Sequence, residues 1–109
     1  MYDTIEQRNE LYADAIKKWG WNAQVNMAVE ELAECIVALQ KVFNRDYSLK
    51  RVEDLASEVA DVTIMMEEVK LILDQANPLE GQTKTFSEMV AEQIQYKLER
   101  TRARIDKQD

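Results

Sequence analysis

Residues 22–43 read NAQVNMAVEELAECIVALQKVF, and the helical architecture of the chain is most evident in these residues. Fourteen of its 22 residues are apolar. They include an unbroken 4-3-4-3-4 series, which is the spacing of one face of an α-helix: Val25, Val29, Leu32, Ile36, Leu39 and Phe43. The remaining apolar residues occupy nearly every other side, whereas a helix on a protein surface keeps a polar face. The stretch therefore predicts a long helix that is covered on more than one side.

Helical patterns also fill the rest of the chain, which contains only two Gly and one Pro. We expect an all-α fold of four helices without strands, over about residues 3–18, 22–44, 49–75 and 86–107. The expected helix ends follow from capping residues and Gly20, with Asp3 and Glu6 at the first start, Ser48 at the third, and a Thr85–Glu88 capping box at the fourth. The third helix carries a second apolar series: Val52, Leu55, Val59, Val62, Met66, Val69 and Leu73.

The chain of 109 residues is expected to be a single domain, residues 1–109. Four helices of one small chain can scarcely cover the apolar circumference of residues 22–43. We therefore expect a homodimer or homotetramer whose protomers contribute helices to a common bundle.

The composition of the chain limits which binding partners, which metal ions and which cellular location we expect. The net charge of −7 argues against a nucleic-acid-binding face. We expect no contact with a membrane, because no apolar run approaches the length of a membrane span and no signal peptide is visible. A single cysteine, Cys35, fits the reducing cytoplasm and a role as a small core residue. Histidine is absent, so any bound metal would be held by oxygen ligands, which favours Mg²⁺ or Mn²⁺.

Four carboxylates stand in unusual surroundings. Glu31 and Glu34 are spaced i, i+3 on the second predicted helix, and Glu58 and Asp61 repeat this spacing on the third. Each pair projects two acids from one side of an apolar helix, with no basic residue beside it to form an ion pair. Carboxylates that are desolvated without partners are costly, so facing pairs would need a shared cation. The alternative is a solvated acidic face on a helical oligomerisation module without catalytic activity.

The motif Glu30-Glu31-Leu32-Ala33-Glu34, followed after 23 residues by Glu58-Val59-Ala60-Asp61, resembles the EExxE…ExxD signature of the MazG-like, all-α nucleoside triphosphate pyrophosphohydrolases. The resemblance extends over roughly residues 19–104. It implies Mg²⁺ ligands at Glu31, Glu34, Glu58 and Asp61. It also implies hydrolysis of a nucleoside triphosphate to the monophosphate and pyrophosphate, as in housecleaning of the nucleotide pool. Phosphoribosyl-ATP pyrophosphohydrolase is the alternative within this superfamily, although the Lys that usually precedes the Glu-Glu there is missing.

The resemblance and the helical spacing suggest further site residues. Glu30 or Glu34 would accept the proton of the attacking water. Lys41 lies two helical turns beyond Glu34 and is a candidate for phosphate binding. Lys97 and Arg104 match a Lys and an Arg that relatives use, although Thr101 stands where Asn is expected; a solvated basic helix end explains these cations equally well.

Trp21 and Gln24 are candidates for base binding by stacking and hydrogen bonding, with Trp19 nearby. Packing of the two indoles at the bend near Gly20 is the alternative.

Overall fold

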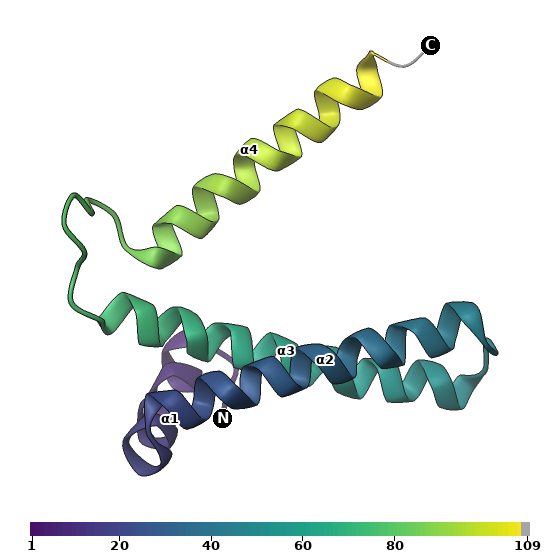
Figure 1. The fold of residues 1–109 in the computed structure, drawn as a ribbon, viewed down its shortest axis with the longest axis horizontal. Coiled ribbons are helices and arrows are strands. Elements are labelled where there is room, and N and C mark those ends of the chain that lie inside the picture. The colour runs from purple at the N-terminus through teal and green to yellow at the C-terminus, as the bar shows by residue number, and fades with distance from the viewer. Residues whose placement is uncertain (108–109) are drawn as a thin grey trace. The chain divides into compact units, whose positions relative to one another are not determined.

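The computed structural model describes residues 1–107, which form four α-helices and contain no strand. Figure 1 shows α1 (Ile5–Trp19), α2 (Trp21–Asn44), α3 (Leu49–Gln75) and α4 (Phe86–Asp106). The predicted all-α class is confirmed, and the helix ends agree with the sequence pattern to within two residues. The chain divides into two compact units, the first covering Met1–Ile72 and the second beginning at Leu73.

The start of α1 differs from the sequence prediction. Thr4, not Asp3, is the N-cap, and its Oγ1 accepts a hydrogen bond from the Gln7 backbone N–H at 3.1 Å. The side-chain oxygen of Gln7 accepts from the backbone N–H groups of Thr4 at 3.0 Å and Asp3 at 2.8 Å. Both Asp3–Glu6 and Thr4–Gln7 have the spacing of a capping box, but the Gln7 amide satisfies two backbone donors at once. The helix therefore begins one residue later than Asp3 would allow.

The other predicted helix ends are confirmed. Gly20 closes α1 and opens α2 with a φ of +89°, a backbone conformation that side chains with a Cβ atom rarely adopt. Ser48 Oγ accepts from the Arg51 N–H at 3.3 Å at the start of α3. In the second unit, Thr85 and Glu88 form the predicted capping box at the start of α4, with bonds of 3.1 and 2.9 Å.

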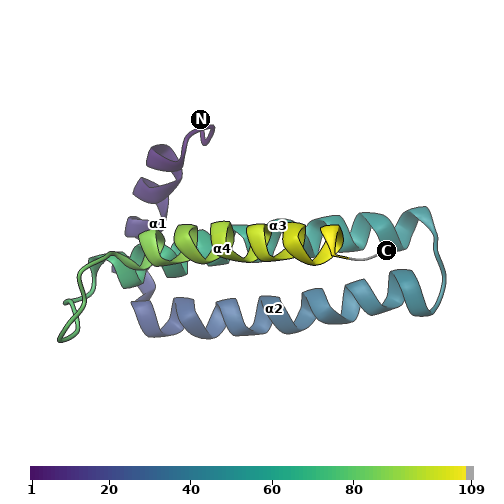
Figure 2. The same ribbon diagram turned by 90° about the horizontal axis from the view of Figure 1, so that it is seen from above.

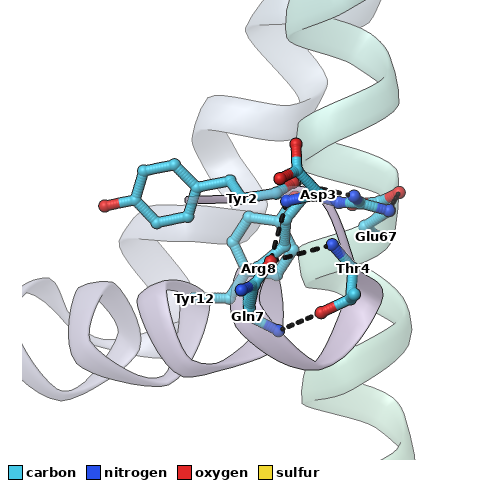
Figure 3. A network of polar contacts seen from close by, with 7 residues as sticks. All are labelled: Tyr2, Asp3, Thr4, Gln7, Arg8, Tyr12 and Glu67. Atoms are coloured by element: carbon cyan, nitrogen blue, oxygen red, sulfur yellow. Dashed lines mark hydrogen bonds and ion pairs between the residues drawn. The ribbon is translucent and has the colours of Figure 1, made fainter.

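A partly buried polar network links α1 to α3 in the first unit (Figure 3). The Arg8 guanidinium donates two hydrogen bonds to the Glu67 carboxylate, at 2.8 and 3.1 Å, and the Tyr12 hydroxyl donates a third at 2.6 Å. Burial of Tyr12, which is only 4% exposed, together with its bond to Glu67, raises the pKa of its hydroxyl to about 12. Hydrogen bonding from Arg8 lowers the pKa of Glu67. The pairing is charge-assisted on both sides, which makes it a strong link between these helices.

Helices α2 and α3 run in opposite directions and are joined by the turn that follows Asn44 (Figure 2). The face of α2 that the first unit covers is the series Gln24, Ala28, Glu31, Cys35, Ala38 and Val42, all buried or half-buried. This series lies one residue away from the apolar series quoted above. The first unit leaves members of that apolar series uncovered, with Val29 and Ile36 61% exposed and Phe43 72% exposed.

The middle of the described chain thus carries two stripes on α2. One packs against α3, and the other is apolar and open.

Among residues 1–107, none of the helices combines the length and the hydropathy needed to cross a lipid bilayer.

Candidate metal centre

The candidate site lies between α2 and α3, and the register of these two antiparallel helices defines it. Gln24 faces Glu68 at one end, since its amide nitrogen, turned toward this carboxylate, lies 3.0 and 2.8 Å from the two oxygens. Two turns further along α2, the acids of α2 meet those of α3. Because the helices are antiparallel, each step toward the C-terminus of α2 is matched by a step toward the N-terminus of α3.

Three of the four predicted carboxylates come together at this point. One oxygen each of Glu31, Glu34 and Glu58 lies within 4.8 Å of the other two. Asp61 lies beside this cluster, and its negative charge raises the pKa of Glu31. The i, i+3 spacing on each helix and the antiparallel register together account for the meeting.

The cluster contains oxygen atoms that lack partners. The Oε2 atoms of Glu31 and Glu58 are both buried, and neither has a hydrogen-bond partner within residues 1–107. Buried polar atoms are nearly always paired, so two orphaned carboxylate oxygens at one place need an explanation. Among residues 1–107, neither carboxylate forms an ion pair with a basic side chain.

Burial and mutual repulsion act on the same groups. Burial raises the pKa of Glu31, and the negative charges of Glu34 and Asp61 raise it further. The pKa of Glu58 is raised by burial and then by the charges of Glu34 and Asp61. Keeping these carboxylates ionised therefore costs free energy, as expected of a site that a bound cation would stabilise.

The donor set suits a hard divalent cation. Three carboxylates from two rigid helices provide oxygen ligands, and the openness of Glu34 to solvent leaves room for water or a substrate oxygen. Mg²⁺ and Mn²⁺ prefer such ligands, and a cation there would satisfy the orphaned Glu31 and Glu58 oxygens.

A groove extends from the cluster toward the turn between α2 and α3. Its volume is about 460 Å³, and Glu34 and Glu58 form its acidic end. Lys41, predicted from its spacing to Glu34, lines the same groove. Sequence reasoning did not identify Arg51, which also lines it. Arg51 precedes Glu58 on α3 by as many residues as Lys41 follows Glu34 on α2. This correspondence could be recognised only once the antiparallel register of α2 and α3 was known.

The remaining predicted residues lie outside the cluster. Glu30 is exposed on α2. Trp21 is 60% exposed at the start of this helix, and Trp19 is similarly open, with the Lys18 ammonium 5.4 Å from its ring centre. Gln24 is buried and bonded to Glu68, so in this structure its amide faces the helix interface.

Lys97 and Arg104 belong to α4 in the second unit, where both are exposed. The hydroxyl of Thr101 donates to the Lys97 carbonyl at 2.8 Å. Their role as phosphate contacts stays a prediction.

A comparison of the chain with models of protein families, with curated proteins and with solved structures returned no significant match.

Proposed function

We propose that this protein is a Mg²⁺-dependent nucleoside triphosphate pyrophosphohydrolase that acts in the cytoplasm on the nucleotide pool. The observation that supports the proposal most is the meeting of Glu31, Glu34 and Glu58 from two helices, with two buried oxygens left without partners. The resemblance of the Glu30–Glu34 and Glu58–Asp61 motifs to the MazG-like signature supplies the reaction class.

The residues in and around the cluster would have different roles in such a reaction. Glu31, Glu34, Glu58 and Asp61 would hold the metal, which when bound neutralises the triphosphate and activates water for attack. Of the two candidates for the proton acceptor, Glu34 lies in the cluster and Glu30 is exposed outside it. This placement favours Glu34.

The proposed protein is a homo-oligomer, a dimer or a tetramer. The open apolar stripe on α2 supports this, because Val29, Ile36 and Phe43 are each more than half exposed in the single chain. Contiguous apolar surface of this kind marks protein interfaces. A second copy laid along α2 would cover the stripe and partly enclose the neighbouring acids.

Thermal unfolding with Mg²⁺ or Mn²⁺ tests the metal site. We expect the metal to raise the Tm of the wild-type protein by mass action, and Glu31→Gln and Glu58→Gln to abolish that rise. Without metal, both variants should be more stable than the wild type, since each removes one of several repelling charges. Glu53→Gln is the matched control, because Glu53 is exposed on α3 outside the cluster. A metal response that persists in Glu58→Gln contradicts the site.

Pyrophosphate release from the eight common NTPs and dNTPs tests the reaction. We expect turnover of at least one with Mg²⁺, none in EDTA, and none with Glu58→Gln. A metal response without turnover of this panel would indicate a substrate outside it, such as phosphoribosyl-ATP. Absence of both turnover and metal response would leave the non-catalytic oligomerisation module, which the open stripe on α2 also favours.

A further inference from the structure

The groove between α2 and α3 is electrically polar along its length. Its acidic end is formed by Glu34 and Glu58, and its opposite end carries Lys41 and Arg51. Lys41 follows Glu34 by seven residues on α2, and Arg51 precedes Glu58 by seven on the antiparallel α3. Both separations correspond to about 10.5 Å along the helix axes, at 1.5 Å per residue. The two cations therefore lie at the same level, about two turns from the carboxylates.

Lys41 and Arg51 differ in the contacts that they already make with other side chains. Among residues 1–107, Lys41 takes part in no ion pair. The Cα–Cβ bond of a helical residue tilts toward the N-terminus of its helix, which for Lys41 is the direction of the acids. Arg51 is 30% exposed and donates to Asp46, an open residue of the turn, at 3.1 Å. This single contact positions the guanidinium at the end of the groove and leaves its other N–H groups unused by side-chain partners in the described chain.

Asp54, the other acid of the groove, is partly neutralised. Its carboxylate pairs with Lys50 at 2.8 Å. The basic end of the groove therefore keeps an attraction for an anion, separate from the carboxylate cluster that attracts a cation.

We propose that Lys41 and Arg51 bind the outermost phosphate of the substrate, so that the polyphosphate lies along the groove with its inner phosphates toward Glu34 and Glu58. This inference rests on the proposed function and adds to it a second phosphate-binding residue, Arg51, and a direction for the substrate. A single phosphate is too short to contact both ends of the groove, whereas an extended triphosphate, together with the reach of the long Lys41 and Arg51 side chains, can contact both. The guanidinium suits this position because its planar donors match phosphate oxygens in pairs.

Calorimetric titration of the full chain with inorganic triphosphate and Mg²⁺ tests the inference. We expect Arg51→Gln and Lys41→Gln each to weaken binding by about 10- to 100-fold, the range for a hydrogen bond to a charged group. Lys17→Gln is the matched control, since it removes one positive charge from an exposed position on α1, and it should bind within about twofold of the wild type.

Circular dichroism checks that the variants fold. The Ser48 cap of α3 uses the backbone N–H of residue 51, which glutamine retains. The rise in Tm produced by Mg²⁺ alone should be the same in Arg51→Gln as in the wild type, because the carboxylate cluster is intact.

The outcomes separate the two proposals. If Mg²⁺ stabilises the protein but Arg51→Gln binds triphosphate as tightly as Lys17→Gln, the phosphate assignment is overturned and the metal site stands. If the wild type shows neither a Mg²⁺ response nor triphosphate binding, the proposed function is overturned and the phosphate assignment with it.

Discussion

Gln24 and Glu68 form the contact that sets the register of α2 against α3, and replacing Gln24 with leucine tests its importance. Glu68 is 2% exposed, and with the Gln24 amide oriented to donate, its nitrogen lies 2.8 and 3.0 Å from the two Glu68 oxygens. No other donor reaches this carboxylate within residues 1–107. Leucine keeps a side chain of similar size at position 24 but removes the donor.

The magnitude follows from the charge of the acceptor. A hydrogen bond to a charged group contributes about 1.5–3 kcal/mol, and a buried acceptor left without a donor is at the upper part of that range. We therefore expect Gln24→Leu to lower the free energy of unfolding by about 2–3 kcal/mol at pH 7, a fall in Tm on the order of 10 °C.

The loss of stability in Gln24→Leu should depend on pH, because Glu68 changes its charge with pH. Burial raises the pKa of Glu68 in the folded protein. Protonated Glu68 therefore favours the fold at low pH, and this contribution is lost as the pH rises through the raised pKa. Without the Gln24 donor the folded-state pKa rises further. The deficit of Gln24→Leu should accordingly be largest above that pKa and shrink as the pH falls and Glu68 becomes neutral.

Urea unfolding followed by circular dichroism between pH 4.5 and 8 measures this deficit. Gln40→Leu, at an exposed position on α2, is the matched control and should change stability by less than about 0.5 kcal/mol. The double variant Gln24→Leu, Glu68→Leu should recover most of the loss, because no buried charge remains. A deficit equal to that of the control, or one that does not vary with pH, would refute the reasoning. A change in nucleobase preference alone would instead support Gln24 as a base-binding residue.

Two further predictions concern α1 and the open face of α2. Because the Tyr12 pKa is about 12 in the fold and about 10 in the unfolded chain, the stability of the wild type should fall as the pH rises from 10 toward 12, by about 1 kcal/mol between pH 10 and pH 11. Tyr12→Phe should lack this loss in urea unfolding. An equal alkaline loss in both proteins would contradict the Tyr12–Glu67 contact. Ile36→Glu should lower the molar mass measured by light scattering to that of a monomer, because it places a charge in the open apolar stripe. Asn26→Glu adds the same charge at an exposed polar position of α2 and should leave the mass unchanged; equal masses for the two variants would exclude the stripe as the interface.

The local features of the fold were predictable because their causes are local. Helix lengths follow from apolar periodicity, and the ends at Gly20, Ser48 and Thr85 follow from the few side chains that satisfy free backbone groups. The start of α1 shows the limit of this reasoning. Two overlapping capping boxes fit the same residues, and only the observed bonds of Gln7 distinguish them.

The sequence predicted that the candidate site is made of carboxylates, but it predicted only in part which of these carboxylates meet. The spacing of Glu31 with Glu34, and of Glu58 with Asp61, indicated which side chains share a helix side. It could not show that Asp61 would lie beside the cluster while the other three carboxylates meet within 4.8 Å. Nor could it show that Gln24 is buried against Glu68, since that depends on a residue 44 positions away in the sequence.

Residues within one or two turns of each other are sufficient to specify the all-α class, the four helices and the pairing of acids on each helix. Only the tertiary structure decided which stripe of α2 packs on α3, which apolar stripe stays open, and that Arg51 stands level with Lys41. The physical reason is that helix register is set by contacts between distant segments, here the buried Gln24–Glu68 pair, whereas periodicity within either helix permits several registers.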